Sequence, residues 1–444
     1  MRACQGHWMA LLISARDFLL PGRTRLTLHR RPTISCCYGR KRSIVTSRRS
    51  IPCICNLTPD TANSLCSRAF SGQAATVMTP ALNSASRLML IAPHPDDEAL
   101  ACSIILQQAV RAGATIRVVY ATDGDDNPWP QRVLERKWRL NAADRKRWGK
   151  LRRAEALAAL RALGVRASDA RFLALPDQGL TNLLKCDCRS TLERFAAIIR
   201  DWPPTHLLVP SIADTHPDHS ALAVMLRLVL AELPGSQMSV WSYAVHGESP
   251  AFFARAEQHR QLEAETAIKL RAIRCHKTQI KLSRRRFLAY AARPERLLKL
   301  RARETTIADG SIRSISRQPH TLRLDLQLSV KSIHAAEPTL YLLSRDVEEA
   351  LRCLSVQLPV RSCRIELRDA ATERRVGVAR YRGNAFAGEL TIPIDIFSSA
   401  PALFVKLERR SWFFDEAGWL EIPAAIHPRQ IISSNIAQPS LAIR

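Results

Sequence analysis

The sequence predicts an α/β fold: a Rossmann-like, mostly parallel sheet with helices on both faces, followed by an all-β, sandwich-like C-terminal appendage. Two observations support this fold class. Between residues 87 and 245, apolar runs of strand length alternate with amphipathic segments of helix length, which is typical of a parallel sheet. Beyond about residue 315, apolar and polar residues alternate with a period of two, as in antiparallel strands.

The α/β pattern contains five expected strands. The runs "RLMLIAP" and "THLLVPS" are almost continuously apolar, as expected for strands that are buried on both faces. Gly113 and Gly164 follow helical patterns and end them, because glycine readily adopts the left-handed conformation found after helices. We expect strands at 87–93, 115–124, 171–180 (a short strand and a loop), 205–211 and 238–245, and helices at 97–113, 152–165, 191–204 and 221–233.

The later pattern sets the domain organisation. Residues 260–290 are expected to form one long polar helix. The period of two then appears in "RLDLQLSV", "SCRIELRD" and "ALFVKLERRSWFF". We predict three parts: a disordered basic N-terminal extension over 1–80, an α/β domain over 85–300 and a β-rich domain over 315–430.

The N-terminal segment differs from the rest in composition. Residues 1–77 hold twelve Lys/Arg against two Asp/Glu and have no sustained periodicity. This composition fits an organellar targeting tail, and it also fits a start codon assigned too early, with Met78 as the true start. We favour the early start.

Composition also limits the partners. The net charge is +26, but we find no nucleic-acid motif, so no nucleic-acid partner is expected. No run of about 18 apolar residues occurs, so no transmembrane segment is expected. The twelve cysteines include no C-x-x-C pair, which argues against a disulfide scaffold and suits a reducing compartment. We therefore predict a cytoplasmic protein.

Two polar clusters follow expected strands. "HPDDE" (94–98) comes directly after the first strand, and "HPDH" (216–219) follows the fourth. In the doubly wound strand order 3-2-1-4-5, strands one and four are neighbours at the point where ligands bind. We therefore expect the two clusters to face each other. An N-capping aspartate at a strand–helix turn would explain Asp96 or Asp97 alone, but not the histidines.

These residue types indicate a catalytic metal site. Two imidazoles and one carboxylate leave coordination positions open, as in catalytic zinc sites. The same set of ligands also binds Fe²⁺, so the ligand types alone do not decide between Zn²⁺ and Fe²⁺. A second aspartate would remain available as a base for a water molecule whose pKa the metal lowers toward roughly 7.

"PHPDDE" with the later "HPDHSAL" resembles the LmbE-like, or PIG-L-type, family of zinc-dependent N-deacetylases. The resemblance covers roughly residues 87 to 295. It implies a hydrolase that removes the acetyl group from N-acetylglucosamine units. It also implies metal ligation by His94, Asp97 and His219, with Asp96 as the general base. His216 would stabilise the oxyanion as an imidazolium.

Further roles follow from the same resemblance. Asp218 would tune the neighbouring histidine, and Arg152 and Asp177 would bind sugar hydroxyls. Each of these two residues also has a purely structural alternative. Arg152 would then be a solvated helix arginine, and Asp177 would form the turn before Gly179. The chain departs from some family members at Asp214, where they have a tyrosine. The resemblance therefore does not establish an oxyanion contact from that side, and such residues are often supplied by mobile loops.

Three functions are compatible with these observations. The first is a metal-dependent hydrolase that removes the N-acetyl group from an N-acetylglucosamine-containing glycoconjugate. The second is an amidase that acts on a larger acyl group or a thiol-sugar conjugate. The third is a basic carbohydrate- or nucleic-acid-binding protein whose metal is structural. The intact set of ligands and base favours the first.

Overall fold

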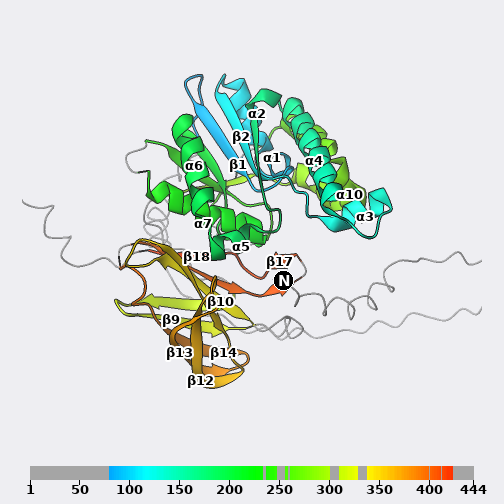
Figure 1. Ribbon diagram of the computed structural model, residues 1–444. Helices are drawn as coiled ribbons and strands as arrows, with labels where there is room; N and C mark the ends of the chain where they lie inside the picture. The colour runs from blue at the N-terminus through cyan, green and yellow to red at the C-terminus, as the bar shows by residue number, and fades with distance from the viewer. Residues whose placement is uncertain are drawn as a thin grey trace, which may run out of the picture. The chain divides into compact units, whose positions relative to one another are not determined.

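The computed structural model describes residues 80–233, 237–247, 256–258, 261–300, 310–328, 338–399, 401–411 and 413–423. The predicted N-terminal extension lies outside these ranges, apart from its last residue. The described residues contain two large sheets (Figure 1), and both belong to one compact unit, residues 74–444. The predicted domain limits of 85–300 and 315–430 stay a prediction. Across the described ranges, no helix combines the length and apolar character needed to cross a membrane.

The first sheet is mostly parallel and confirms the predicted α/β class. Its strand order is β3-β2-β1-β4-β5-β7-β6, so β1 lies between β2 and β4 as the order 3-2-1-4-5 requires. The final two strands pair antiparallel at one edge. The strands are β1 (Arg87–Ala92), β2 (Thr115–Thr122), β3 (Ala170–Leu175), β4 (His206–Pro210), β5 (Ser239–Tyr243), β6 (Glu257–Gln258) and β7 (Arg296–Lys299).

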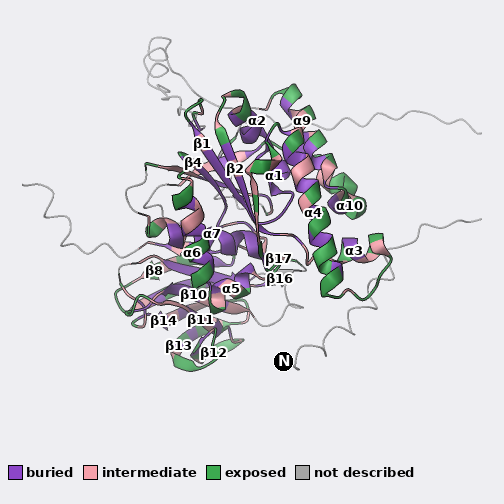
Figure 2. Cartoon of the chain, turned by 45° about the horizontal axis from the view of Figure 1, so that its top comes forward, coloured by how far each residue is buried: buried purple, intermediate pink, exposed green. Residues whose placement is uncertain are grey.

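Helices cover both faces of this sheet, and each face has its own core. Leu88 and Leu90 of β1 enter one core, whereas Met89 and Ile91 enter the other. Figure 2 shows β1, β2 and β4 in purple, buried between the helices. The helices are α1 (Asp97–Leu100), α2 (Ser103–Arg111), α3 (Pro128–Glu135), α4 (Ala142–Ala162), α5 (Leu180–Cys186), α6 (Arg189–Asp201), α7 (Pro217–Ala231), α9 (Glu263–Cys275) and α10 (Lys277–Ala289).

Three helices differ from the sequence prediction. The helix expected over 97–113 is divided into α1 and α2, and α4 begins ten residues before the expected start, after a capping box formed by Asn141 and Asp144. The helix expected over 260–290 is divided at His276, whose φ of −81° and ψ of 65° end α9. The Nε2 atom of His276 hydrogen-bonds Oε1 of Glu98 at 2.8 Å. A long-range contact that local periodicity does not encode therefore accompanies this break.

The second sheet is antiparallel throughout and curls around a single core. Ser311 and Ile312, at the start of β8, line a small cavity together with Leu407 and Leu420 from the other end of the strand order. The sheet is therefore nearly barrel-like. In order it contains β18 (Leu420–Ile422), β15 (Leu403–Glu408), β10 (Thr339–Arg345), β11 (Leu351–Gln357), β12 (Arg361–Asp369), β13 (Arg375–Asn384), β14 (Ala387–Pro393), β9 (Thr321–Gln327) and β8 (Ile312–Arg317).

A small hairpin extends from this second sheet. Its strands are β16 (Arg410–Ser411) and β17 (Phe414–Asp415), which pair antiparallel. Nearby, Phe404 and Trp419 belong to the same hydrophobic cluster as α7. The β region is thus packed directly against the α/β part.

Candidate metal and catalytic site

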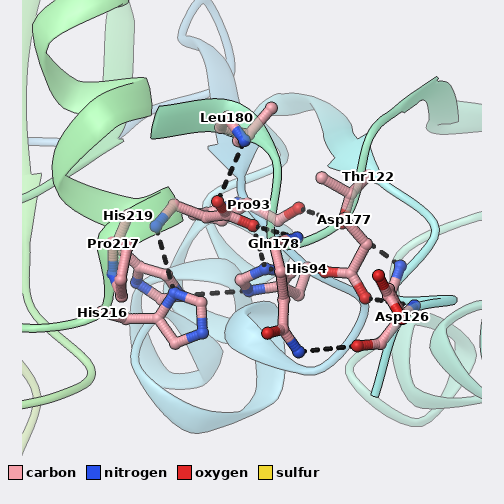
Figure 3. A network of polar contacts seen from close by, with 12 residues as sticks. Pro93, His94, Thr122, Asp126, Asp177, Gln178, Leu180, His216, Pro217 and His219 are labelled. Atoms are coloured by element: carbon pink, nitrogen blue, oxygen red, sulfur yellow. Dashed lines mark hydrogen bonds and ion pairs between the residues drawn. The ribbon is translucent and has the colours of Figure 1, made fainter. Parts of the chain in front are cut away.

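The two polar clusters meet at the carboxyl edge of the first sheet. β1 ends at Ala92 and is followed by His94, and β4 ends at Pro210, a few residues before His219. The Nδ1 atom of His94 lies 3.2 Å from Nε2 of His219. Figure 3 shows the two imidazoles side by side. The adjacent positions of β1 and β4 therefore bring together residues that are far apart in sequence.

Asp97 completes a set of three possible metal donors. Its Oδ2 lies 3.7 Å from Nδ1 of His94, and its Oδ1 lies 3.5 Å from Nε2 of His219. Donor atoms about 2.1 Å from one tetrahedral ion are separated by roughly 3.4 Å, so these spacings suit a single cation. Among the described residues, three further groups in the same place have one donor atom per residue within 4.8 Å of the others: His94/His216/His219, Asp97/His219/His246 and His94/Asp177/Asp218.

The outward-facing nitrogen of each imidazole contacts a carboxylate. Nε2 of His94 lies 3.2 Å from Asp177 and 3.3 Å from Asp218, and Nδ1 of His219 lies 3.1 Å from Asp214. Burial disfavours the charged form of His94, but the hydrogen bonds with these carboxylates outweigh it and raise its pKa well above the usual value. Metal-ligating histidines commonly carry such carboxylate partners, which fix the ring orientation.

Asp97 is almost fully buried, and its Oδ2 accepts the main-chain N–H of His94 at 2.8 Å. Burial raises the pKa of Asp97 to about 6, although the charge of His219 opposes this shift. A cation beside such a carboxyl group favours its ionised form. The site thus contains a carboxylate that a metal ion would stabilise.

Asp96 occupies a strained backbone position beside these donors. Its φ is 152° and its ψ is −20°, a region that residues with a side chain rarely adopt. Although it precedes α1, its side chain makes no capping hydrogen bond within the described chain, so capping does not explain it. Its Oδ2 instead accepts a hydrogen bond from Nη2 of Arg152 at 3.1 Å. Backbone strain of this kind concentrates at functional sites.

Arg152 is buried in the site and is not the solvated helix arginine that was the alternative. It donates from Nη1 to the carbonyl oxygen of Gly124 at 2.9 Å and from Nη2 to that of Pro95 at 2.8 Å. Position 124 requires glycine: its φ is +63°, and a Cβ there would lie 1.9 Å from Nη1 of Arg152. The "DGD" turn after β2 is therefore shaped to receive this guanidinium.

The second cluster is fixed by the start of α7. Nδ1 of His216 accepts the main-chain N–H of Asp218 at 3.2 Å, whereas the Asp218 carboxylate accepts the N–H groups of Gln178 and Leu180 at 2.6 and 3.1 Å. The carboxylate of Asp218 is thus directed to His94 and to the loop that carries Asp177. Burial, reinforced by the neighbouring histidines, holds the pKa of His216 well below its usual value.

Two important residues were not predicted from the sequence. Asp214 is buried and accepts N–H groups from His216, Val245 and His246, besides contacting His219. Burial disfavours its carboxylate, but the charge and hydrogen bond of His219 lower its pKa to about 2. Asp214, which the sequence showed only as a departure from the family pattern, therefore orients the second cluster.

His246 is the other unpredicted residue. Its ring centroid lies 4.9 Å from that of His219 and 5.5 Å from that of His216, and burial lowers its pKa to about 3. Its Nδ1 has no hydrogen-bond partner among the described residues. Its position shortly after β5, at the same sheet edge as the two clusters, was the sequence signal that could have identified it as a site residue.

A cavity of about 250 Å³ opens onto this site. Its polar wall includes His94, Asp96, Arg152, Asp177 and His216. All five were predicted as site residues, and they share one cavity. Their roles stay predictions.

Residues 89–230 match the model of the PIG-L family, described as GlcNAc-PI de-N-acetylase. Both polar clusters lie within this match. The match covers less than half of the chain. The resemblance inferred from the two motifs is therefore confirmed, whereas α9, α10 and the whole β region lie outside the matched residues.

Curated proteins and solved structures also resemble parts of this chain. Two curated relatives are 1D-myo-inositol 2-acetamido-2-deoxy-alpha-D-glucopyranoside deacetylases from Mycobacterium avium and Mycolicibacterium paratuberculosis, 32% and 33% identical over 147 residues. These alignments cover 30% of this chain and 47% of each relative, so the chain spans about half the length of the curated relatives it matches. The solved N,N'-diacetylchitobiose deacetylase from Pyrococcus horikoshii aligns over 49% of this chain and 84% of its own, with 19% identity and a TM-score of 0.38.

Proposed function

We propose that this protein is a metal-dependent N-deacetylase that hydrolyses the acetamide of an N-acetylglucosamine-containing glycoconjugate. One observation carries the proposal. The inner nitrogens of His94 and His219 lie 3.2 Å apart, and each lies within 3.7 Å of one of the two carboxylate oxygens of Asp97; Asp96 lines the cavity at the same place. The names of the curated relatives support an N-acetylated amino sugar as the substrate class.

His94, Asp97 and His219 would hold the ion, which we propose to be Zn²⁺; Fe²⁺ suits the same ligands. When bound, the ion supplies Lewis-acid chemistry, which acidifies water and polarises a carbonyl oxygen. The carboxylates on the far nitrogens of both histidines keep the inner nitrogens directed at the same point.

Asp96 is proposed as the general base. It takes a proton from the attacking water and delivers it to the sugar nitrogen as the C–N bond breaks, which yields acetate and the free amine. Arg152 donates to Oδ2 of Asp96 at 3.1 Å and so fixes the orientation of this carboxylate. Because its other contacts fix it to Gly124 and Pro95, we assign Arg152 to positioning Asp96, in addition to the predicted contact with sugar.

His216 is proposed to donate a hydrogen bond to the developing oxyanion. Its Nδ1 accepts a main-chain N–H, so its proton resides on Nε2 and the ring is neutral, unlike the imidazolium expected from the resemblance. A neutral imidazole can still act as the donor. Asp177 keeps acceptor capacity at the cavity wall and is proposed to bind a sugar hydroxyl.

Acetate release tests the proposal. Zinc-loaded protein should release acetate from N-acetylglucosaminyl compounds, including the inositol glycoside. Asp96→Asn should lower kcat by about 100- to 10,000-fold, the usual range for loss of a general base, while the protein keeps one zinc per chain. No acetate release across such a panel would overturn the proposal, and release of longer acyl groups only would favour the amidase alternative. The cytoplasmic location stays a prediction.

A further inference from the structure

Part of the cavity lining comes from residues outside the match to the PIG-L family. Leu282 and Phe287 come from α10, Phe413 comes from the turn of the β16–β17 hairpin, and Phe414 is the first residue of β17. The cavity lining therefore combines the polar residues proposed for catalysis with apolar and aromatic side chains. Ligand sites commonly combine a largely apolar lining with a few polar groups that fix orientation.

Main-chain contacts fasten this hairpin to the loop that carries His216. The N–H of Asp415 donates to the carbonyl oxygen of Thr215 at 2.8 Å, and the N–H of Trp419 donates to that of Ile212 at 2.8 Å. A Cβ at Gly418 would lie 2.1 Å from the Ile212 oxygen, so only glycine allows this approach. The β region thus holds its hairpin in register with the catalytic loop.

A buried ion pair connects the same elements. Nζ of Lys406, on β15, lies 2.5 Å from Oδ2 of Asp415, and both side chains are completely buried. The same Nζ lies 3.4 Å from the hydroxyl oxygen of Ser220, in the first turn of α7. Buried charges need well-formed geometry to offset their desolvation. This pair therefore favours a single position for the hairpin.

Phe414 packs against His216 and His246. Its ring centroid lies 5.8 Å from that of His216, at an interplanar angle of 79°, and 5.2 Å from that of His246. The guanidinium carbon of Arg286, another residue at the cavity, lies 5.5 Å from the Phe414 ring. Phe413 remains 38% exposed at the opening. An exposed aromatic ring beside a reaction site provides a flat apolar surface for a bound ring.

We propose that Phe413 and Phe414 form an outer subsite that binds the ring attached to the reacting amino sugar, a second sugar or an aryl group with an apolar face. This inference rests on the proposed deacetylase function. The amino sugar would occupy the polar wall near Asp96, and its neighbour would contact the two phenylalanines. The β region then determines substrate choice, although it lies outside the family match.

The test compares one-ring and two-ring substrates in the zinc-loaded full chain. N-acetylglucosamine is the one-ring substrate, and N,N'-diacetylchitobiose and 4-nitrophenyl N-acetyl-β-glucosaminide are the two-ring substrates. We expect kcat/KM to favour two rings by about tenfold, as one aromatic contact permits. In the Phe413→Ala/Phe414→Ala variant this ratio should approach one. Phe386→Ala, on the distant turn between β13 and β14, should leave the ratio unchanged.

Binding provides a second readout that does not depend on turnover. Asp96→Asn protein is titrated calorimetrically with N-acetylglucosamine and with N,N'-diacetylchitobiose. It should bind chitobiose more tightly, and this preference should be lost when Phe413→Ala and Phe414→Ala are added. The outer subsite is overturned if the double-alanine variant keeps its parent's preference for two-ring over one-ring compounds, both in kcat/KM and in binding affinity. If the unmodified protein releases no acetate but the binding preference behaves as expected, the deacetylase proposal fails and the subsite stands.

Discussion

The two sheets of this protein use side-chain alternation in different ways. In the first sheet both faces are buried, so consecutive residues of β1 enter two separate cores. The polar chemistry is consequently excluded from the strands and gathers at their carboxyl ends. In the second sheet one face encloses the core, and strands such as β9 alternate buried and exposed residues along their length. Its contribution to the cavity comes from a hairpin outside the main ladder.

This difference explains why the sequence predicts the polar clusters of the first sheet but not the hairpin that the second sheet contributes to the cavity. A parallel sheet fixes where its strand ends meet, so a motif after β1 and another after β4 must converge. An antiparallel barrel-like sheet gives no such rule for its hairpins. The position of Phe414 depends on contacts with Thr215 and Ile212 that only the folded chain reveals.

The largest expected effect on stability comes from the ion pair that links the hairpin to the rest. Lys406→Ala removes the ammonium group beside the fully buried Asp415 carboxylate. We expect the free energy of unfolding to fall by about 3–5 kcal/mol, measured by urea denaturation. Arg166→Ala, which breaks the exposed pair with Asp169, is the control and should change it by less than about 1 kcal/mol.

A double variant separates charge from packing. Lys406→Met with Asp415→Leu replaces the pair by apolar groups and should recover most of the lost stability, because no buried charge remains. If Lys406→Ala were as stable as the unmodified chain, the ion pair would not hold the hairpin in place.

A smaller effect on stability is expected where the hairpin approaches the loop that carries His216. Gly418→Ala places a Cβ 2.1 Å from the Ile212 oxygen, so the backbone must shift. Overpacking of this kind costs about 1–3 kcal/mol, and we expect a matching fall in thermal stability together with a reduced preference for two-ring substrates. Gly377→Ala is the control because its nearest neighbour would be 3.4 Å away, an ordinary contact. Unchanged selectivity in Gly418→Ala would separate the hairpin from substrate choice.

Much of the site could be predicted from the sequence. The run after β1 and the cluster after β4 identified residues that the fold brings together at one sheet edge, because the carboxyl ends of neighbouring parallel strands meet there. The strand order that joins them also followed from the alternating pattern. The division at His276 could not be predicted, because its bond to Glu98 is a long-range contact. The roles of Asp214 and His246 depend on hydrogen bonds and ring contacts between loops, for which sequence spacing gives no rule.

The proposed deacetylase function depends on one cation held between the ends of β1 and β4. The most direct test is a crystal structure of the zinc-loaded protein with data collected at the zinc absorption edge. We predict one anomalous peak within about 2.0–2.2 Å of Nδ1 of His94, Nε2 of His219 and a carboxylate oxygen of Asp97. An empty position there, or a peak on His94, Asp177 and Asp218 instead, would contradict the account.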